Sequence, residues 1–261
     1  MFFDTHTHLD DEKFKDVRGE LLTELPAAGI APVMAIAADR ESCFSALRLA
    51  EENGFILAAV GQHPDAAQHM DEAQFAELKE LAVHPRVKCI GEIGLDYHWP
   101  QDTDKERQKY WFTRQMELAE ELDLPVSIHS RDAMADTLEI LRKFPKVQGV
   151  MHCYAGSYHT MRELVKMGYY IALGGVVTFK NARMAKEVAQ YVPLDRLLLE
   201  TDCPYLAPEP HRGHLNTPLY LPLVAQTIAE IRRMPVEEVA KATRENGMRL
   251  FHITQNGERY E

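Results

Sequence analysis

The sequence contains few cysteines, and no two of them stand in a CxxC spacing. Cys43, Cys89, Cys153 and Cys203 are scattered through a chain of 261 residues. Disulfide frameworks belong mainly to short secreted chains in which cysteines are dense. We therefore expect a reduced, cytoplasmic protein, in which cysteines within apolar runs serve as small core residues.

Long apolar runs are also missing. A membrane-spanning helix needs about 18 uninterrupted apolar residues, and no stretch of the chain approaches that length. The first residues run directly into FFDTHTHL, without the basic and apolar regions of a secretory signal. We expect no membrane partner, and 46% hydrophobic with 26% charged residues is typical of an ordinary globular protein.

An excess of positive charge is lacking as well. The formal net charge is −11 at pH 7, which argues against a broad surface for binding phosphate backbones. The same charge is compatible with an acidic protein that holds cations and meets phosphate locally through them.

The chain does contain an alternation of short apolar runs and amphipathic stretches. A strand followed by a helix about every 33 residues is typical of a (β/α)₈ barrel, and near-continuous apolar strands suit a parallel sheet covered on both faces. An open doubly wound sheet is the alternative, but THTHLDD lacks the Gly-rich turn that usually follows its first strand. The predicted strands are 2–8, 31–38, 55–63, 88–97, 125–130, 148–153, 169–175 and 197–203.

Helical spacing predicts the elements between and after these strands. Helices are expected at 44–53 and at 104–125, with Asp104 as cap and Pro125 at the end. One or two further helices, over 219–234 and 235–251, follow Pro218 and are expected to close the barrel. No linker interrupts the series, so we predict one α/β domain over residues 1–261, a TIM barrel with C-terminal closing helices.

The segment FDTHTHL places three polar side chains on one face of a strand that is otherwise apolar. Asp4, His6 and His8 alternate, and alternate residues of a strand point the same way. Burying them is costly unless each finds a partner. The alternatives are a hydrogen-bonded core cluster, an exposed edge strand, or a metal site in which both imidazoles reach one cation.

Further polar residues interrupt the other apolar runs near their C-terminal ends. A single strand histidine is more often a satisfied core group, but several at one depth, on the face where barrel enzymes keep their active sites, indicate a shared site. The candidate metal ligands are His6, His8, Glu92, His129, His152 and Asp202.

Four imidazoles and two carboxylates are too many ligands for one tetrahedral ion with an open position. They suit two divalent cations, with Glu92 as the bridge, His6 and His8 on one ion, and His129 and His152 on the other. Asp202 is expected beside the His6 and His8 ion, because strand eight neighbours strand one in a closed barrel.

Two such cations lower the pKa of a shared water and neutralise charge on a phosphoryl oxygen. Asp202 is then the predicted base for that water, and Glu92 and Asp202 are the candidate catalytic residues. Asp4 is expected to support the ligands from a deeper layer. Glu200 lies two residues before Asp202, as Asp4 lies two residues before His6. For Glu200, an internal hydrogen bond is at least as good an interpretation as a catalytic role.

At this point the motifs resemble those of the TatD family of metal-dependent deoxyribonucleases, in order and over essentially the whole chain. The resemblance implies an amidohydrolase-like TIM barrel that cleaves phosphodiesters in DNA, with 3′ to 5′ exonuclease action. It implies metal roles for the same six residues and favours Mg²⁺, whereas imidazole-rich ligation alone favours Zn²⁺, Mn²⁺ or Ni²⁺. The motifs are FDTHTHLD, GQHP (61–64), GEIGLDYHW (91–99), PVSIHSR (125–131), MHCYAGS (151–157) and LLLETDCPYLAP (197–208).

Three residues are candidates for substrate binding. The resemblance suggests that His63 contacts a substrate phosphate, with a loop-stabilising hydrogen bond as the alternative. His98 and the adjacent Trp99 follow strand four and would border a nucleotide. Arg212 matches a basic, RGKRNEP-like segment of the family. The corresponding segment here, PHRGHLNTP (210–218), has His214 and Leu215 where basic residues are usual and Thr217 in place of the acid. Fewer positive charges weaken contacts to the phosphate backbone of long DNA.

Other functions remain open from the sequence. DNA is the expected substrate, with RNA or a small phosphoester as alternatives. An amide or ester hydrolase of the amidohydrolase type often bridges its metals with a lysine on strand four, but Lys88 lies too early there. The last alternative is a non-catalytic, metal-stabilised barrel that acts as a binding protein.

Overall fold

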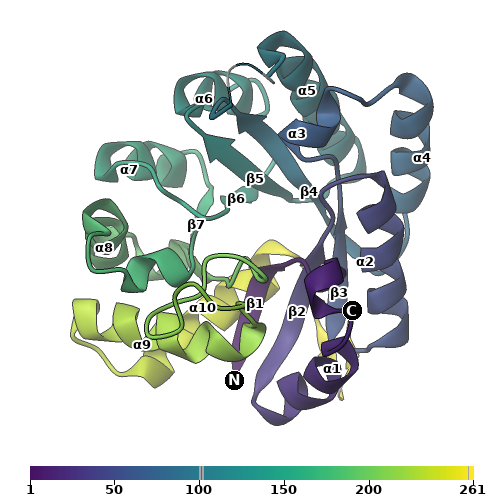
Figure 1. Ribbon diagram of the computed structural model, residues 1–261. Coiled ribbons are helices and arrows are strands. Elements are labelled where there is room, and N and C mark those ends of the chain that lie inside the picture. Colours follow the sequence, from purple (N-terminus) through teal and green to yellow (C-terminus); the bar gives the residue numbers. More distant parts are fainter. Residues whose placement is uncertain (100, 102, 258) are drawn as a thin grey trace.

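A computed structural model describes residues 1–99, 101, 103–257 and 259–261. Its main sheet has eight parallel strands in chain order, each hydrogen-bonded to the next (Figure 1). The strands are β1 (Phe2–Thr7), β2 (Ile30–Ile36), β3 (Ile56–Val60), β4 (Val87–Asp96), β5 (Val126–Arg131), β6 (Gly149–Met151), β7 (Tyr170–Leu173) and β8 (Leu197–Leu199).

The two ends of this sheet approach each other just after β1 and β8. Thr7 and Cys203 form a parallel bridge, and the His8 amide donates to the Cys203 carbonyl oxygen at 2.8 Å. The prediction of a (β/α)₈ barrel is confirmed. The doubly wound alternative is wrong, because strand order in such a sheet reverses partway across.

Helices surround the strands in Figure 1, and most of them follow a strand of the barrel. The α-helices are α1 (Arg18–Ala27), α2 (Arg40–Glu52), α3 (Pro64–Ala67), α4 (Glu72–Ala82), α5 (Lys105–Leu122), α6 (Met134–Leu141), α7 (Tyr158–Lys166), α8 (Arg183–Tyr191), α9 (Leu221–Arg232) and α10 (Val236–Leu250). Short 3₁₀ helices are η1 (Glu12–Phe14), η2 (Gly175–Thr178), η3 (Leu194–Arg196) and η4 (Pro218–Tyr220). A small antiparallel hairpin, β9 (Gln255–Asn256) with β10 (Arg259–Tyr260), was not predicted.

Local sequence signals account for the helix boundaries. The Asp104 side chain accepts from the Arg107 amide at 3.0 Å and begins α5, as predicted. The helix ends when Asp123 takes a left-handed conformation at φ 53°, three residues before β5. Asp39 and Asp71 form capping boxes at the starts of α2 and α4.

Several strands end earlier than predicted. The runs 55–63, 148–153 and 197–203 leave the sheet after Val60, Met151 and Leu199. The chain therefore turns into loop before the polar residues at the mouth, and His152 and Asp202 follow their strands rather than ending them. Glu92 also lies in the middle of β4 and not late in it, because that strand continues to Asp96.

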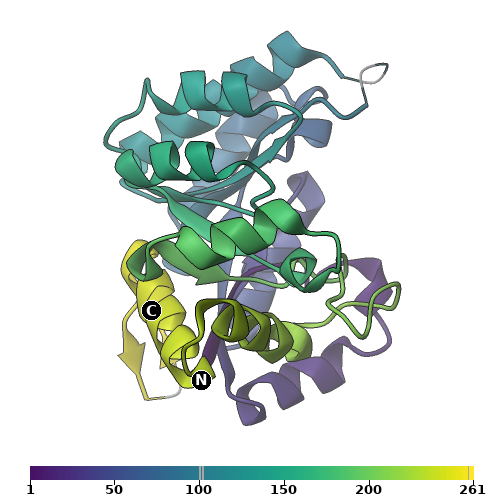
Figure 2. The ribbon, with the colours of Figure 1, turned by 90° about the vertical axis from the view of Figure 1, so that its left-hand side faces the viewer.

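An apolar cluster fills the barrel interior beneath the mouth. Its members include Phe3, Met34 and Leu198, and Phe251 packs into it at the end of α10. Gly247 permits this contact, since a Cβ atom there would lie 2.6 Å from Phe3 Cδ1. In Figure 2, α10 and the hairpin lie at the left, and the loop after β8 projects at the right. The predicted closing role is confirmed for α10.

Within the described part of the chain, no helix combines the length and apolarity that crossing a membrane requires. All four cysteines are free thiols, and Cys43, Cys89 and Cys203 are buried.

Candidate metal centre

The six predicted metal ligands come together at the mouth of the barrel, on the side opposite α10. Five of them line a cleft of about 860 Å³. His6 lies beneath the cleft and is only 1% exposed. Groups of these side chains place their ligand atoms within 4.8 Å of one another.

Glu92 lies at the centre of this cluster, between two pairs of imidazoles. Its Oε2 is 3.4 Å from His6 Nε2 and 3.6 Å from His8 Nε2. Its Oε1 is 2.9 Å from His129 Nδ1 and 3.4 Å from His152 Nε2. One carboxylate oxygen therefore faces each pair, which is the geometry expected of a bridging ligand.

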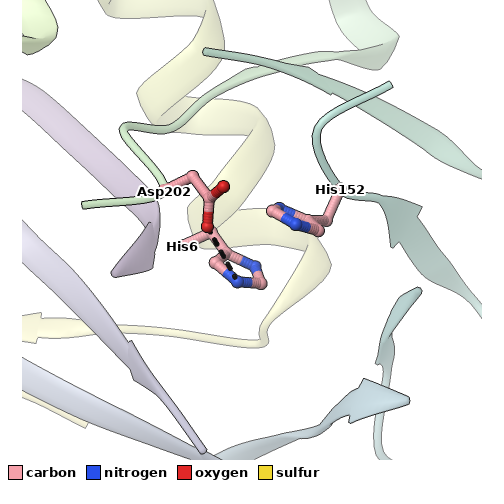
Figure 3. Close-up of side chains that lie close together, drawn as sticks. All are labelled: His6, His152 and Asp202. Carbon is pink, nitrogen blue, oxygen red and sulfur yellow. Dashed lines mark ion pairs between the residues drawn. The ribbon is translucent and has the colours of Figure 1, made fainter. Parts of the chain in front are cut away.

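The His6 and His8 side of the cluster also includes Asp202. The two Nε2 atoms are 3.3 Å apart, and Asp202 Oδ1 lies 3.9 Å from His6 Nε2 and 3.6 Å from His8 Nε2. Ligand atoms about 2.1 Å from one cation are about 3.4 Å apart in a tetrahedron. Figure 3 shows Asp202 pointing toward His6, with His152 beside the His6 ring. The centroids of the His6 and His152 rings are 3.6 Å apart. The two Nε2 atoms of His6 and His8 and the Oδ1 atom of Asp202 therefore have the spacing expected of ligands of one cation.

Hydrogen bonds fix the four imidazoles through the nitrogen that faces away from Glu92. A carbonyl or carboxylate oxygen only accepts, so the outer nitrogen of His8, His129 and His152 donates, and the inner one carries a lone pair whenever the ring is neutral. The partners are Ile36 O for His8 Nδ1 (3.0 Å), Asp96 Oδ2 for His129 Nε2 (3.0 Å), Glu200 Oε2 for His152 Nδ1 (3.1 Å) and Ser127 Oγ for His6 Nδ1 (3.3 Å). Once its imidazoles are neutral, the cluster therefore presents lone pairs inward, which fits divalent cations.

Asp4 and Glu200 lie below the cleft and hold the segments that carry the ligands. Asp4 accepts from the Thr201 amide at 2.9 Å and from the Thr201 hydroxyl at 2.6 Å, and burial raises its pKa to about 8. Glu200 Oε1 accepts from the Cys153 amide at 2.6 Å, while Oε2 holds His152. Both side chains have the positions expected of supporting groups, and Glu200 makes the predicted internal hydrogen bond.

The cluster combines ionised carboxylates with protonated imidazoles when no cation is bound. Burial opposes ionisation of Glu92, but His152, His63 and His6 outweigh it and hold the pKa of Glu92 well below its usual range. Burial likewise opposes protonation of His152, yet Glu200, Glu92 and Asp202 raise its pKa to about 10. The pKa of His129 rises to about 9, against burial, through Asp96 and Glu92. In the metal-free protein, protons on His129 and His152 therefore balance the negative charge that bound cations would otherwise balance.

Metal binding is expected to release protons at pH 7. Both His129 and His152 have pKa values above 7 in the metal-free protein and are protonated there, whereas a ligating imidazole must be neutral. The apparent affinity for a divalent cation should therefore rise as the pH rises toward 9. Calorimetric titration in buffers with different ionisation enthalpies measures the protons released, and a heat that is the same in every buffer would contradict this account.

His63 differs from the four candidate ligands because the nitrogen that it turns toward Glu92 carries a hydrogen. Its Nδ1 accepts from the Asp65 amide at 3.2 Å, so the hydrogen of the neutral ring is on Nε2, which lies 3.8 Å from Glu92 Oε1. Burial lowers the pKa of His63 to about 4, so the ring is neutral at pH 7. His63 thus offers a hydrogen-bond donor rather than a lone pair, which suits the predicted contact with a phosphate oxygen.

The other two predicted substrate contacts lie outside the residues that line the cleft. His98 Nδ1 is 3.0 Å from Asp132 Oδ2, and the exposed Trp99 packs edge-on against its ring. The Arg212 guanidinium lies over the Phe179 ring, 4.3 Å from its centroid. Substrate binding by His98 and Arg212 stays a prediction.

Two charged cleft residues on the strands that carry Glu92 and His129 were not predicted from the sequence. Asp96 holds His129, and it follows Glu92 by four residues on the same strand, so the alternation of strand side chains places it on the same face. Arg131 also lines the cleft, two residues after His129 on β5. The spacing that identified Asp4, His6 and His8 would have identified both.

Comparison with known proteins identifies the family of this chain. The model of the TatD related DNase family matches residues 3–252. The metal-dependent hydrolase YabD of Bacillus subtilis (strain 168) is 45% identical over 97% of this chain and 100% of its own length, and YcfH of Escherichia coli (strain K12), named in the same way, is 40% identical over 96% and 95%. The crystal structure of YJJV, a TatD homologue from Escherichia coli K12, superposes with a TM-score of 0.91 at 31% identity, covering 97% of this chain and 98% of that one. The chain therefore belongs to the TatD family and is a metal-dependent hydrolase.

Proposed function

We propose that this hydrolase cleaves phosphodiester bonds in DNA, releasing nucleotides from the 3′ end. The observation that carries the proposal is the position of Glu92, with one oxygen toward His6 and His8 and the other toward His129 and His152. Two divalent cations bridged by a carboxylate suit the displacement at a phosphodiester. The match to a family described as DNases supports DNA as the substrate.

In the proposed reaction, His6, His8 and Asp202 would hold one cation, His129 and His152 would hold the other, and Glu92 would contribute an oxygen to each. The bound cations would lower the pKa of water and withdraw charge from the phosphoryl oxygens. The donor set favours Zn²⁺, Mn²⁺ or Ni²⁺, while family membership favours Mg²⁺.

Asp202 is the proposed base. Burial opposes its ionisation, but His152 and His8 outweigh this effect and lower its pKa, so the side chain is ionised at neutral pH. Its Oδ1 faces His6 and His8, which leaves Oδ2 to accept the proton of the attacking water. His63 would donate its Nε2 hydrogen to a non-bridging oxygen of the phosphate.

The negative charge at the rim of the cleft favours some substrates over others. Carboxylates line the cleft beside the loops after β1, β2 and β3, namely Asp10, Asp11, Glu12, Asp39, Glu41 and Asp65. These charges repel a polyanion that runs across the whole mouth, which favours the end of a strand over an internal site. The same rim supports a small phosphoester as the second candidate substrate.

Digestion of end-labelled single-stranded DNA tests the proposal. Metal-stripped protein would be compared with protein supplied with Mg²⁺, Mn²⁺ or Zn²⁺, and a labelled RNA and an aryl phosphodiester would be run beside it. We expect a metal-dependent ladder that shortens from the 3′ end. Hydrolysis of the aryl ester without cleavage of DNA would favour the small phosphoester, whereas no turnover of any phosphodiester would overturn the proposal.

A further inference from the structure

Charge is distributed unevenly around the mouth of the barrel. The carboxylates of the rim lie beside β1, β2 and β3, whereas Arg131 is the one Lys or Arg among the described residues that line the cleft. It ends β5, which lies four strands from β1 in an eight-stranded barrel and therefore across the mouth from it (Figure 1).

Other cations near the acidic side are engaged in contacts of their own. Arg18 donates to the backbone carbonyl oxygens of residues 9, 10 and 11 at 2.6–3.0 Å. Arg40 pairs with Glu77 through two nitrogens, and the Lys13 ammonium lies over the Tyr205 ring. These side chains hold the loops together and are not directed at a ligand in the cleft.

Arg131 differs from them because its acidic neighbours have other partners. Asp96 Oδ2 pairs with His129 and Asp132 Oδ2 pairs with His98, each at 3.0 Å. Among the residues that the structure describes, no carboxylate oxygen lies within 4.0 Å of the Arg131 guanidinium. An exposed guanidinium in a cleft, with five donors and no anionic partner in the part of the chain that the structure describes, is suited to a planar anion.

Backbone hydrogen bonds between β4 and β5 fix the position of the Arg131 main chain. The Arg131 carbonyl oxygen accepts from the Tyr97 amide at 2.9 Å, and Arg131 is paired with Asp96 across β4 and β5. Two residues separate it from His129, so both side chains leave the same face of the strand. The guanidinium therefore extends from the rim beside the proposed second cation.

We propose that Arg131 binds the phosphate of the substrate, donating two N–H groups to its non-bridging oxygens from the side of the cleft opposite the acidic rim. This inference rests on the proposed phosphodiesterase function. In a cleft whose other fixed charges are mostly negative, Arg131 would decide which way the phosphate faces and from which side the substrate enters.

Substitution of Arg131 tests the inference with two readouts. Arg131→Gln is expected to weaken competitive inhibition by inorganic phosphate about 10- to 100-fold and to raise KM for an aryl phosphodiester similarly. Arg131→Lys should recover part of the loss, because lysine keeps the charge but loses the paired donors. The matched control is Arg162→Gln, an exposed arginine on α7 whose guanidinium lies over Tyr158.

The outcomes separate this inference from the function on which it rests. Metal content of Arg131→Gln should equal that of the wild type, since a loss of metal would mean that the residue acts through the ligands and would overturn phosphate binding by Arg131. Phosphate inhibition and KM unchanged in the variant, with an active wild type, would overturn the inference alone. A wild type that hydrolyses no phosphodiester would overturn the proposed function and the inference with it.

Discussion

Replacing Glu92 with alanine is expected to abolish hydrolysis and most metal binding while the barrel stays folded. The carboxylate faces the imidazoles of all four candidate ligands, so its loss removes the one group shared by both proposed cations. Transition-state stabilisation by bound cations amounts to several kcal/mol, which corresponds to a loss of more than about 1,000-fold in kcat/KM. Turnover of an aryl phosphodiester and metal content after dialysis are the measurements.

The barrel should remain folded in this variant because its apolar cluster lies below the site and contains none of the ligands. Circular dichroism and thermal unfolding check this. Glu139→Ala serves as the control, since Glu139 is exposed on α6 and pairs only with Lys143 in the described contacts. Turnover retained by Glu92→Ala would contradict the proposal that Glu92 bridges the two cations.

Asparagine in place of Asp202 is expected to lower kcat about 100- to 10,000-fold, the usual contribution of a general base. The amide keeps a similar shape and one oxygen toward His6 and His8 but cannot accept a proton from water. The loss should appear in kcat more than in KM, and the variant should still bind cation at the His129 and His152 side. Steady-state kinetics and metal content measure both effects, and a kcat within threefold of the wild type would assign the proton to another group.

Much of the fold follows from the sequence because the strands of this barrel are buried on both faces. Their apolar runs stand out against the amphipathic helices, and all eight were located. The strand ends were less predictable. In 148–153 the apolar pattern continues to Cys153, but the chain leaves the sheet after Met151 because β6 pairs with its neighbours only to that point. The β9–β10 hairpin is mostly exposed and carries no apolar alternation.

The cluster of candidate metal ligands was predictable because polar and charged groups inside apolar runs need a compensating partner. What spacing alone could not give is the direction of each ring. His63 and His129 are both histidines at the mouth, yet the Asp65 amide makes Nδ1 of His63 an acceptor, while Asp96 makes Nε2 of His129 a donor. Which histidine offers a lone pair and which offers a hydrogen depends on these local partners, and they become visible only in the folded chain.

The most direct test of the account is the position of bound cations in crystals of this protein grown with Zn²⁺ or Mn²⁺ and measured by anomalous scattering. The account predicts two peaks on either side of the Glu92 carboxylate, one among His6, His8 and Asp202 and the other between His129 and His152. A single peak, or two peaks that do not share Glu92, would contradict the bridged pair and the mechanism derived from it.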